Sequence, residues 1–261
     1  MKAIHEKFIR AKPFAIDKTI IKLPSLEKIF DLGIDEYFEY LYSLIMDFDS
    51  IRGSEALNPD IYYSDYELFV LILLSDEKFK ETSLKALEFF TGDRFVFTEQ
   101  AIVSARKKTS DGVLHPLSEE ADGEFIIYDI LTEELWQKIR EALTIAHWIP
   151  LPIERGPLKG KAAEIADKIR RNKEEVARIK AKQNKGNVST EIYELVASIA
   201  ARSPSYNLFN VWQLTYYQFF DQFKRIQLDE EYKYSLEQIL VGVDPKKLEI
   251  RHWSSSILTQ K

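Results

Sequence analysis

The clearest helix start in the chain is the stretch Ser64-Asp65-Tyr66-Glu67-Leu68-Phe69-Val70-Leu71-Ile72-Leu73-Leu74. Ser64 and Glu67 stand at the spacing of a capping box, in which each side chain accepts a hydrogen bond from the other residue's backbone N–H. The residues that follow are apolar on nearly every side of a helix, so we expect this helix to lie at the centre of the core. The stretch predicts a protein built on helices.

Helical spacing of apolar residues recurs along most of the chain. Ser25 can cap the first of two helices, or a single broken helix, with the break at Gly33. Thr132 can cap another helix with Glu133 and Glu134 in its positively charged first turn. Further helices are expected over residues 77–91, 159–185 and 189–203, and a last one runs from 209 until 241–245 ends it.

Two parts of the chain have strand character. The segment 14–22 suits one short strand that ends before Pro24. The segments 94–98 and 125–128 are β-branched and aromatic and could pair as a hairpin, with 107–123 as the best candidate for a mobile surface loop. The predicted fold class is therefore mainly α: a helical globular protein with a small β-hairpin or minor sheet (α+β).

Proline and glycine gather at one point of the chain. Trp148 to Pro157 holds three prolines and ends in Gly156-Pro157, which makes it the most plausible boundary or hinge. We expect an N-terminal helical domain with minor β structure over 1–155. A C-terminal helical region, with a basic exposed helix and an aromatic core helix, is expected over 156–261.

The composition narrows the class of protein. Of the 261 residues, 45% are hydrophobic and 13% aromatic, which is enough for a core without covalent staples. Cysteine is absent, as is typical of a reducing compartment. Met1 to Arg10 mixes charges with short apolar runs, unlike a signal peptide. The longest apolar run, Leu68 to Leu74, falls far short of the ~20 residues that cross a bilayer. We expect a cytoplasmic protein that is not embedded in a membrane.

Basic residues are concentrated in one segment of an acidic chain. The net charge of -6 and the pI near 5.5 argue against binding of nucleic acid by the whole surface. The segment 159–185, however, holds ten basic residues against four acidic ones, with a thin apolar stripe and no aromatic residue. Such a segment is most commonly a solvated helix or helical hairpin, and it could also dock an acidic protein or contact nucleic acid. The predicted basic surface consists of Lys168, Arg170, Arg171, Lys173 and Arg178.

An aromatic stripe marks the last expected helix. Its rings recur at helical spacing, which is how a core is usually filled, and an interface role stays open. Gln213, Gln218, Asp221 and Gln222 could then form a polar edge across a subunit contact. The predicted partner-binding residues are Phe209, Trp212, Tyr216, Phe219, Phe220 and Phe223.

No motif in the chain carries catalytic chemistry. Gly156 to Ala162 superficially resembles a phosphate loop, but it is one residue short and Ala162 stands where a magnesium-binding hydroxyl is needed. Asp47-Phe48-Asp49 could hold a divalent cation, and a hydrolase built on Asp47 and Asp49 is our third hypothesis. The four histidines stand far apart and show no metal-binding spacing: His5, His115, His147 and His252. We predict no catalytic residue, no metal ligand, no cofactor and no enzymatic activity.

Three stretches together carry a resemblance to a known group of proteins. They are Ile21-Lys22-Leu23-Pro24-Ser25-Leu26-Glu27-Lys28-Ile29, Tyr66-Glu67-Leu68-Phe69 and Asn210-Val211-Trp212-Gln213-Leu214-Thr215-Tyr216-Tyr217-Gln218-Phe219. The chain resembles uncharacterised proteins of similar length from the tail-assembly gene blocks of phages and prophages of Gram-positive bacteria, some of them called tail assembly chaperones. These are packing motifs, so the resemblance assigns no residue a functional role, and 159–185 matches no pattern of the family.

The resemblance implies a function without catalysis. Such a protein would bind apolar segments of the tape-measure or tail-tube protein until assembly, or would have a structural role in the particle. Its place would be the host cell cytoplasm, or the virion if it is retained there, and a homo-oligomer is left open. The alternative hypothesis is a nucleic-acid-binding or regulatory factor that uses the basic helix 159–185.

Overall fold

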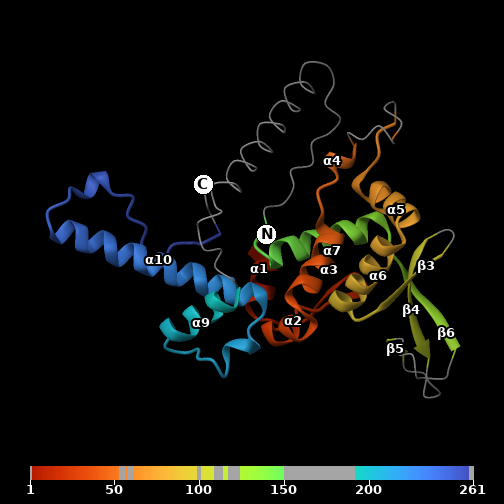
Figure 1. Ribbon diagram of the computed structural model, residues 1–261, viewed down its shortest axis with the longest axis horizontal. Helices are drawn as coiled ribbons and strands as arrows, with labels where there is room; N and C mark the ends of the chain where they lie inside the picture. Colours follow the sequence, from red (N-terminus) through yellow and green to blue (C-terminus); the bar gives the residue numbers. More distant parts are fainter. Residues whose placement is uncertain are drawn as a thin grey trace.

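The computed structural model describes residues 2–52, 57, 61–98, 101–108, 114–116, 124–149 and 192–258. Within these ranges the protein is mainly α-helical with two small antiparallel sheets, which confirms the predicted fold class (Figure 1). In chain order the elements are α1 (Lys2–Ile9), β1 (Phe14–Ile16), β2 (Thr19–Ile21), α2 (Leu26–Leu32), α3 (Ile34–Ile45), α4 (Asp49–Arg52), α5 (Asp65–Ser75), α6 (Glu77–Thr91), β3 (Arg94–Phe97), β4 (Ile102–Lys108), β5 (Leu114–Pro116), β6 (Glu124–Ile130), α7 (Glu133–Ala146), α9 (Ile192–Arg202), the 3-10 turn η2 (Val211–Gln213), α10 (Tyr216–Leu240) and the 3-10 turn η3 (Pro245–Lys247).

Local capping signals fix where most helices begin. Ser25 accepts a hydrogen bond from the backbone N–H of Lys28, and Thr132 accepts one from that of Leu135. Ser64 and Glu67 form both bonds of the predicted capping box at the start of α5. Gly33, at φ 102°, separates α2 from α3 as expected. Short-range chemistry therefore sets these boundaries, as the sequence predicts.

The helix α5 is less central than its composition suggests. Leu68, Phe69 and Leu73 are buried, whereas Leu74 is 66% exposed on the opposite side. The helix lies at the edge of the body, where it packs on α6 and α7 with one face only (Figure 1). Its apolar composition could not reveal this, because burial depends on where neighbouring helices lie.

Both predictions about β structure need correction. The segment 14–22 forms two strands, β1 and β2, that turn back at Asp17, whose φ of 53° is the left-handed conformation that Asp tolerates. The segments 94–98 and 125–128 do not pair with each other, because β4 lies between β3 and β6 and pairs with both. Two parts of the predicted loop 107–123 are strand instead: Lys107–Lys108 belong to β4, and 114–116 form β5. The rest of 107–123 lies outside the described residues.

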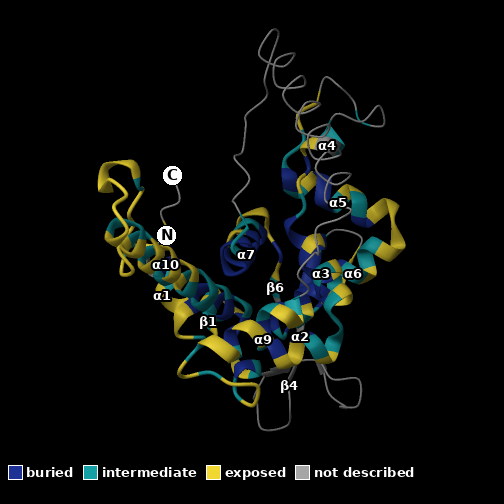
Figure 2. Cartoon of the chain, turned by 60° about the vertical axis from the view of Figure 1, so that its left-hand side comes forward, coloured by how far each residue is buried: buried dark blue, intermediate teal, exposed yellow. Residues whose placement is uncertain are grey.

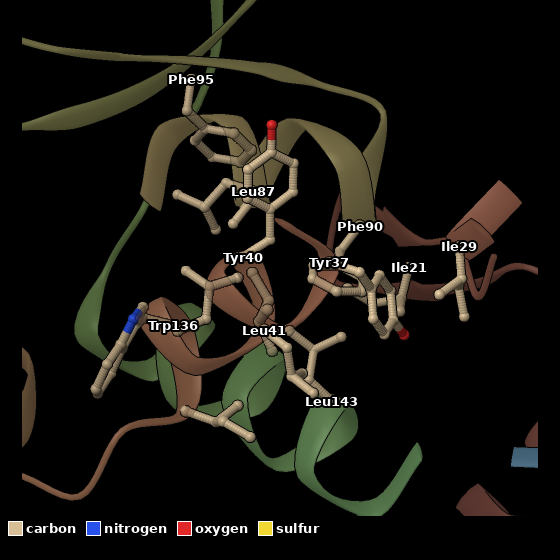
Figure 3. Close-up of a cluster of buried hydrophobic side chains, with 14 of the residues drawn as sticks. Ile21, Ile29, Tyr37, Tyr40, Leu41, Leu87, Phe90, Phe95, Trp136 and Leu143 are labelled. Carbon is tan, nitrogen blue, oxygen red and sulfur yellow. The ribbon is translucent and has the colours of Figure 1, made fainter. Parts of the chain in front are cut away.

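One hydrophobic cluster joins the elements before and after residues 150–191. Tyr37, Leu41, Phe90 and Trp136 form its centre between α3, α6 and α7 (Figure 3). Val196 and Phe219, from α9 and α10, belong to the same cluster. The boundary at 148–157 stays a prediction, since most of it lies outside the described residues.

Candidate protein-interaction surface

The aromatic stripe does not form a single helix. α10 begins at Tyr216, because Thr215 and Gln218 form a capping box there. Phe209 and Trp212 precede this cap, in a loop that contains η2, so the prediction of a helix from Phe209 to Phe223 was wrong. Helical spacing extends by chance through the loop, and the cap decides where the helix begins.

The helical part of the stripe faces the protein interior. Phe219 is fully buried, and Tyr216, Phe220 and Phe223 are partly buried against the main cluster. The Tyr216 ring stacks on Phe220 with centroids 4.6 Å apart, and Phe220 meets Phe223 edge-on at 6.2 Å. These four rings pack α10 onto the body, as rings at helical spacing usually do.

Phe209 is the most exposed aromatic side chain in the described residues. It is 93% exposed, and its neighbour Leu208 is 58% exposed. We call residues 203–214 the Phe209 loop. A loop that presents two large apolar side chains to water is unfavourable for the free protein unless a partner covers them.

Hydrogen bonds hold the Phe209 loop in shape. The Asn207 carboxamide oxygen accepts from the Phe209 N–H at 2.9 Å, and the Asn210 oxygen accepts from the Asn207 N–H at 2.8 Å. The Asn210 amide also donates to the Ser205 carbonyl at 3.1 Å. Because side chains replace the missing backbone partners, the loop keeps one conformation while its apolar side chains stay outside.

Trp212 connects the Phe209 loop to α2. Its indole N–H donates to the Leu208 carbonyl at 2.8 Å, and its ring meets Phe30 edge-on with centroids 5.1 Å apart. The backbone N–H of Leu26 donates to the Leu214 carbonyl at 2.8 Å. The structure therefore brings Leu208, Phe209, Trp212 and Phe30 together at one end of the body, and the sequence had not suggested Phe30.

A second apolar surface lies on the far part of α10. The helix extends away from the body, and the chain after it folds back along it (Figure 1). We call residues 229–258 the distal arm, which is mostly exposed or half-buried (Figure 2). Leu240 and Val241, at the end of the helix, are 85% and 82% exposed. The sequence reasoning overlooked this surface, although Leu236 and Leu240 stand four residues apart on one helix face.

The structure describes the Asp47 and Asp49 pair but not the predicted basic surface or the loop 156–162. The predicted basic surface, Lys168, Arg170, Arg171, Lys173 and Arg178, lies outside the described residues, and so does the loop 156–162. Asp49 pairs with Arg52, and the Asp47 carboxylate accepts a hydrogen bond from the Asp49 backbone N–H at 3.0 Å. Within the described ranges, no three His, Cys, Asp or Glu side chains are placed to hold a metal ion.

His147 is the most perturbed histidine that the structure describes. Burial lowers its pKa to about 4, against a hydrogen bond to the Leu143 carbonyl that favours the charged form. The ring donates from Nδ1 to that carbonyl at 2.6 Å, so Nε2 accepts from the Tyr37 hydroxyl. Both ring nitrogens of the neutral form are satisfied, which gives His147 a structural role.

This burial predicts a pH dependence of stability. The pKa of His147 is lower in the folded protein than in the unfolded chain. The contribution of His147 to the free energy of unfolding is therefore fully present above pH 6.5 and is lost as the pH drops towards about 4. Between pH 6.5 and 5, His147 should remove about 2 kcal/mol from the free energy of unfolding. Urea unfolding across this range checks it. His147→Gln, which takes up no proton, should have a flatter profile than the wild type.

The comparisons with known proteins concern the C-terminal part of the chain. Residues 180–258 match the family model of the YomV second domain. This is a phage-type family, after YomV of Bacillus phage SPBc2, and the match points to a phage protein. The matched segment holds α9, the Phe209 loop, α10 and the distal arm.

The remaining comparisons found no match, and the described helices show no membrane span. No curated protein and no solved structure matches the chain. Among the described helices, none combines the length and the apolar character that crossing a bilayer requires.

Proposed function

We propose that this chain is a phage protein that works by binding other proteins, without catalysis, and that the Phe209 loop is the centre of its contact surface. The observation that carries the proposal is the 93% exposure of Phe209 in a loop held by side-chain hydrogen bonds. Exposed aromatic anchors supply most of the binding energy of many interfaces. A loop already fixed in its bound shape loses little conformational entropy on association.

The partner we propose is a tail protein of the same phage. The match of 180–258 to a phage-type family supports a phage origin, and the resemblance to tail-module proteins favours assembly as the process. The chain would cover apolar segments of the tape-measure or tail-tube protein in the host cytoplasm, and could stay in the virion. The distal arm, with Leu240 and Val241, would add a second apolar contact.

Co-purification tests this proposal. The full chain is expressed together with the tape-measure and tail-tube proteins of the same phage, and complexes are separated by size-exclusion chromatography. Wild-type chain should elute with one of them. Phe209→Ser should weaken that complex by about 30-fold or more, as expected for a hot-spot residue. Its unfolding midpoint should be unchanged, because the Phe209 ring is exposed.

Tyr193→Ser is the matched control. Tyr193 is an aromatic residue on α9 with 53% exposure, inside the same family match and outside the Phe209 loop. This variant should bind like wild type. A wild-type chain that stays monomeric beside both tail proteins, or a Phe209→Ser variant that binds as tightly as wild type, would contradict the proposal.

The alternative of nucleic-acid binding rests on the sequence of 159–185 alone. A salt titration with duplex DNA and RNA tests it, because contacts to phosphate weaken steeply with ionic strength. Binding that is absent at low salt, or that persists when Arg170, Arg171 and Lys173 become Ala, removes this alternative.

A further inference from the structure

Exposed carboxylates predominate on α2, which contacts η2 in the Phe209 loop, and on α3, which follows α2 in the chain. Over residues 26–45, which hold α2 and α3, five acidic side chains stand against the single Lys28, and all five are exposed. None of these five carboxylates forms an ion pair with any residue that the structure describes. Glu36 accepts a hydrogen bond from the Tyr40 hydroxyl, and the other four are Glu27, Asp31, Asp35 and Glu39.

Two of these carboxylates flank the aromatic contact directly. Glu27 lies three residues before Phe30 on α2, at the spacing of neighbouring side chains on a helix surface, and Asp31 follows Phe30 directly in the same helix. Phe30 in turn meets Trp212 at 5.1 Å, and Trp212 is bonded to Leu208. We call Phe30, Leu208, Phe209 and Trp212, together with Glu27 and Asp31, the acidic aromatic surface.

We propose that the acidic aromatic surface takes a cationic segment of a partner protein, one that carries apolar side chains between lysines or arginines. This inference rests on the proposed function and names the chemistry of the partner. The rings would receive the apolar side chains, and the carboxylates would face the cations and guide the encounter. Guanidinium groups can also stack on the exposed faces of the rings.

A second copy of this chain fits the surface less well. An isologous contact places the same patch of both copies together, so Glu27 and Asp31 would face their own equivalents. Like charges brought together in this way oppose association. A cationic partner removes that repulsion and leaves the apolar contact intact.

Peptide binding tests the chemistry of the partner. The probes are two synthetic helical peptides of about 18 residues, both with Leu at positions i, i+3, i+4 and i+7, and with either Lys or Glu at the remaining positions. Binding to the full chain is measured by fluorescence anisotropy of a labelled peptide. The Lys peptide should bind, and its affinity should fall as salt rises from about 50 to about 300 mM. The Glu peptide should bind at least about tenfold more weakly.

Charge-reversal variants locate the binding. We expect about a tenfold or larger loss of affinity for the Lys peptide in each of two variants, the double variant Glu27→Lys/Asp31→Lys and the single variant Phe209→Ser. The control Glu81→Lys/Glu88→Lys makes the same change of net charge on exposed positions of α6 and should bind within about twofold of wild type.

Three outcomes would overturn the inference. They are equal binding of the two peptides, a control variant that loses as much affinity as the Glu27/Asp31 variant, and a dimer in sedimentation that Phe209→Ser dissolves. If a tail protein binds through Phe209 while the peptides show no charge preference, the proposed function stands and this inference falls. If no tail protein binds but the Lys peptide binds at Phe209, the proposed function falls and the chemistry of the surface stands.

Discussion

Asp65→Ala should lower the free energy of unfolding by about 3–5 kcal/mol, because it leaves the buried Arg140 cation without its counter-ion. The Asp65 carboxylate is 8% exposed and binds two guanidinium groups, those of Arg52 and Arg140. Arg140 is buried as well, and its remaining contacts are the Met46 carbonyl at 2.8 Å and the ring faces of Phe48 and Trp136. None of these neutral groups replaces a carboxylate.

Urea unfolding of purified variants measures this effect. Asp49→Ala is the matched control, since Asp49 also pairs with Arg52 but its carboxylate is 52% exposed. An ion pair in water contributes little, so the control should change the free energy of unfolding by about 1 kcal/mol or less. If the two variants are equally stable, the Arg52–Asp65–Arg140 cluster does not act as a buried ion network.

Trp136→Ala should lower the free energy of unfolding by about 3–5 kcal/mol through the cavity that it leaves. The Trp136 side chain is 1% exposed and stacks on Phe69 with centroids 5.2 Å apart. It also contacts the rings of Phe48 and Tyr66 at 5.9 and 5.7 Å. These contacts join α5 to α7, so the loss should appear as a lower midpoint in thermal and urea unfolding.

Two further variants serve as comparisons for Trp136→Ala. The Trp136 indole nitrogen has no hydrogen-bond partner among the described residues, so Trp136→Phe should lose less stability than Trp136→Ala. Trp253→Ala, at a half-exposed position of the distal arm, should change the free energy of unfolding by about 0.5 kcal/mol or less. A Trp136→Ala protein as stable as Trp253→Ala would contradict the description of this core.

The features predicted well from the sequence are those set by neighbouring residues. Ser25, Ser64 and Thr132 cap helices because the side chain and the backbone N–H that it satisfies are at most three residues apart. Gly33 breaks the helix because its conformation is local. The overall fold class follows from such signals, summed along the chain.

The features missed depend on residues that meet only in three dimensions. No strand was predicted over β4, and its last two residues were placed in the loop 107–123, yet Arg106 is held in the sheet by two hydrogen bonds to the buried Asp93. The start of α10 was placed seven residues too early, at Phe209, although Thr215 and Gln218 have capping-box spacing. The contact of Phe30 with Trp212 joins α2 to a loop about 180 residues away, which no sequence pattern shows.

Amide hydrogen exchange of the chain with and without its tail-protein partner tests the central proposal most directly. Exchange slows where a partner covers the backbone or stabilises it. Our account expects slower exchange at residues 205–214 and at α2 in the complex than in the free chain. It expects the exchange rates throughout α6 to be the same in both. Complex formation that protects only other parts of the chain, with the Phe209 loop exchanging as in the free protein, would contradict the account.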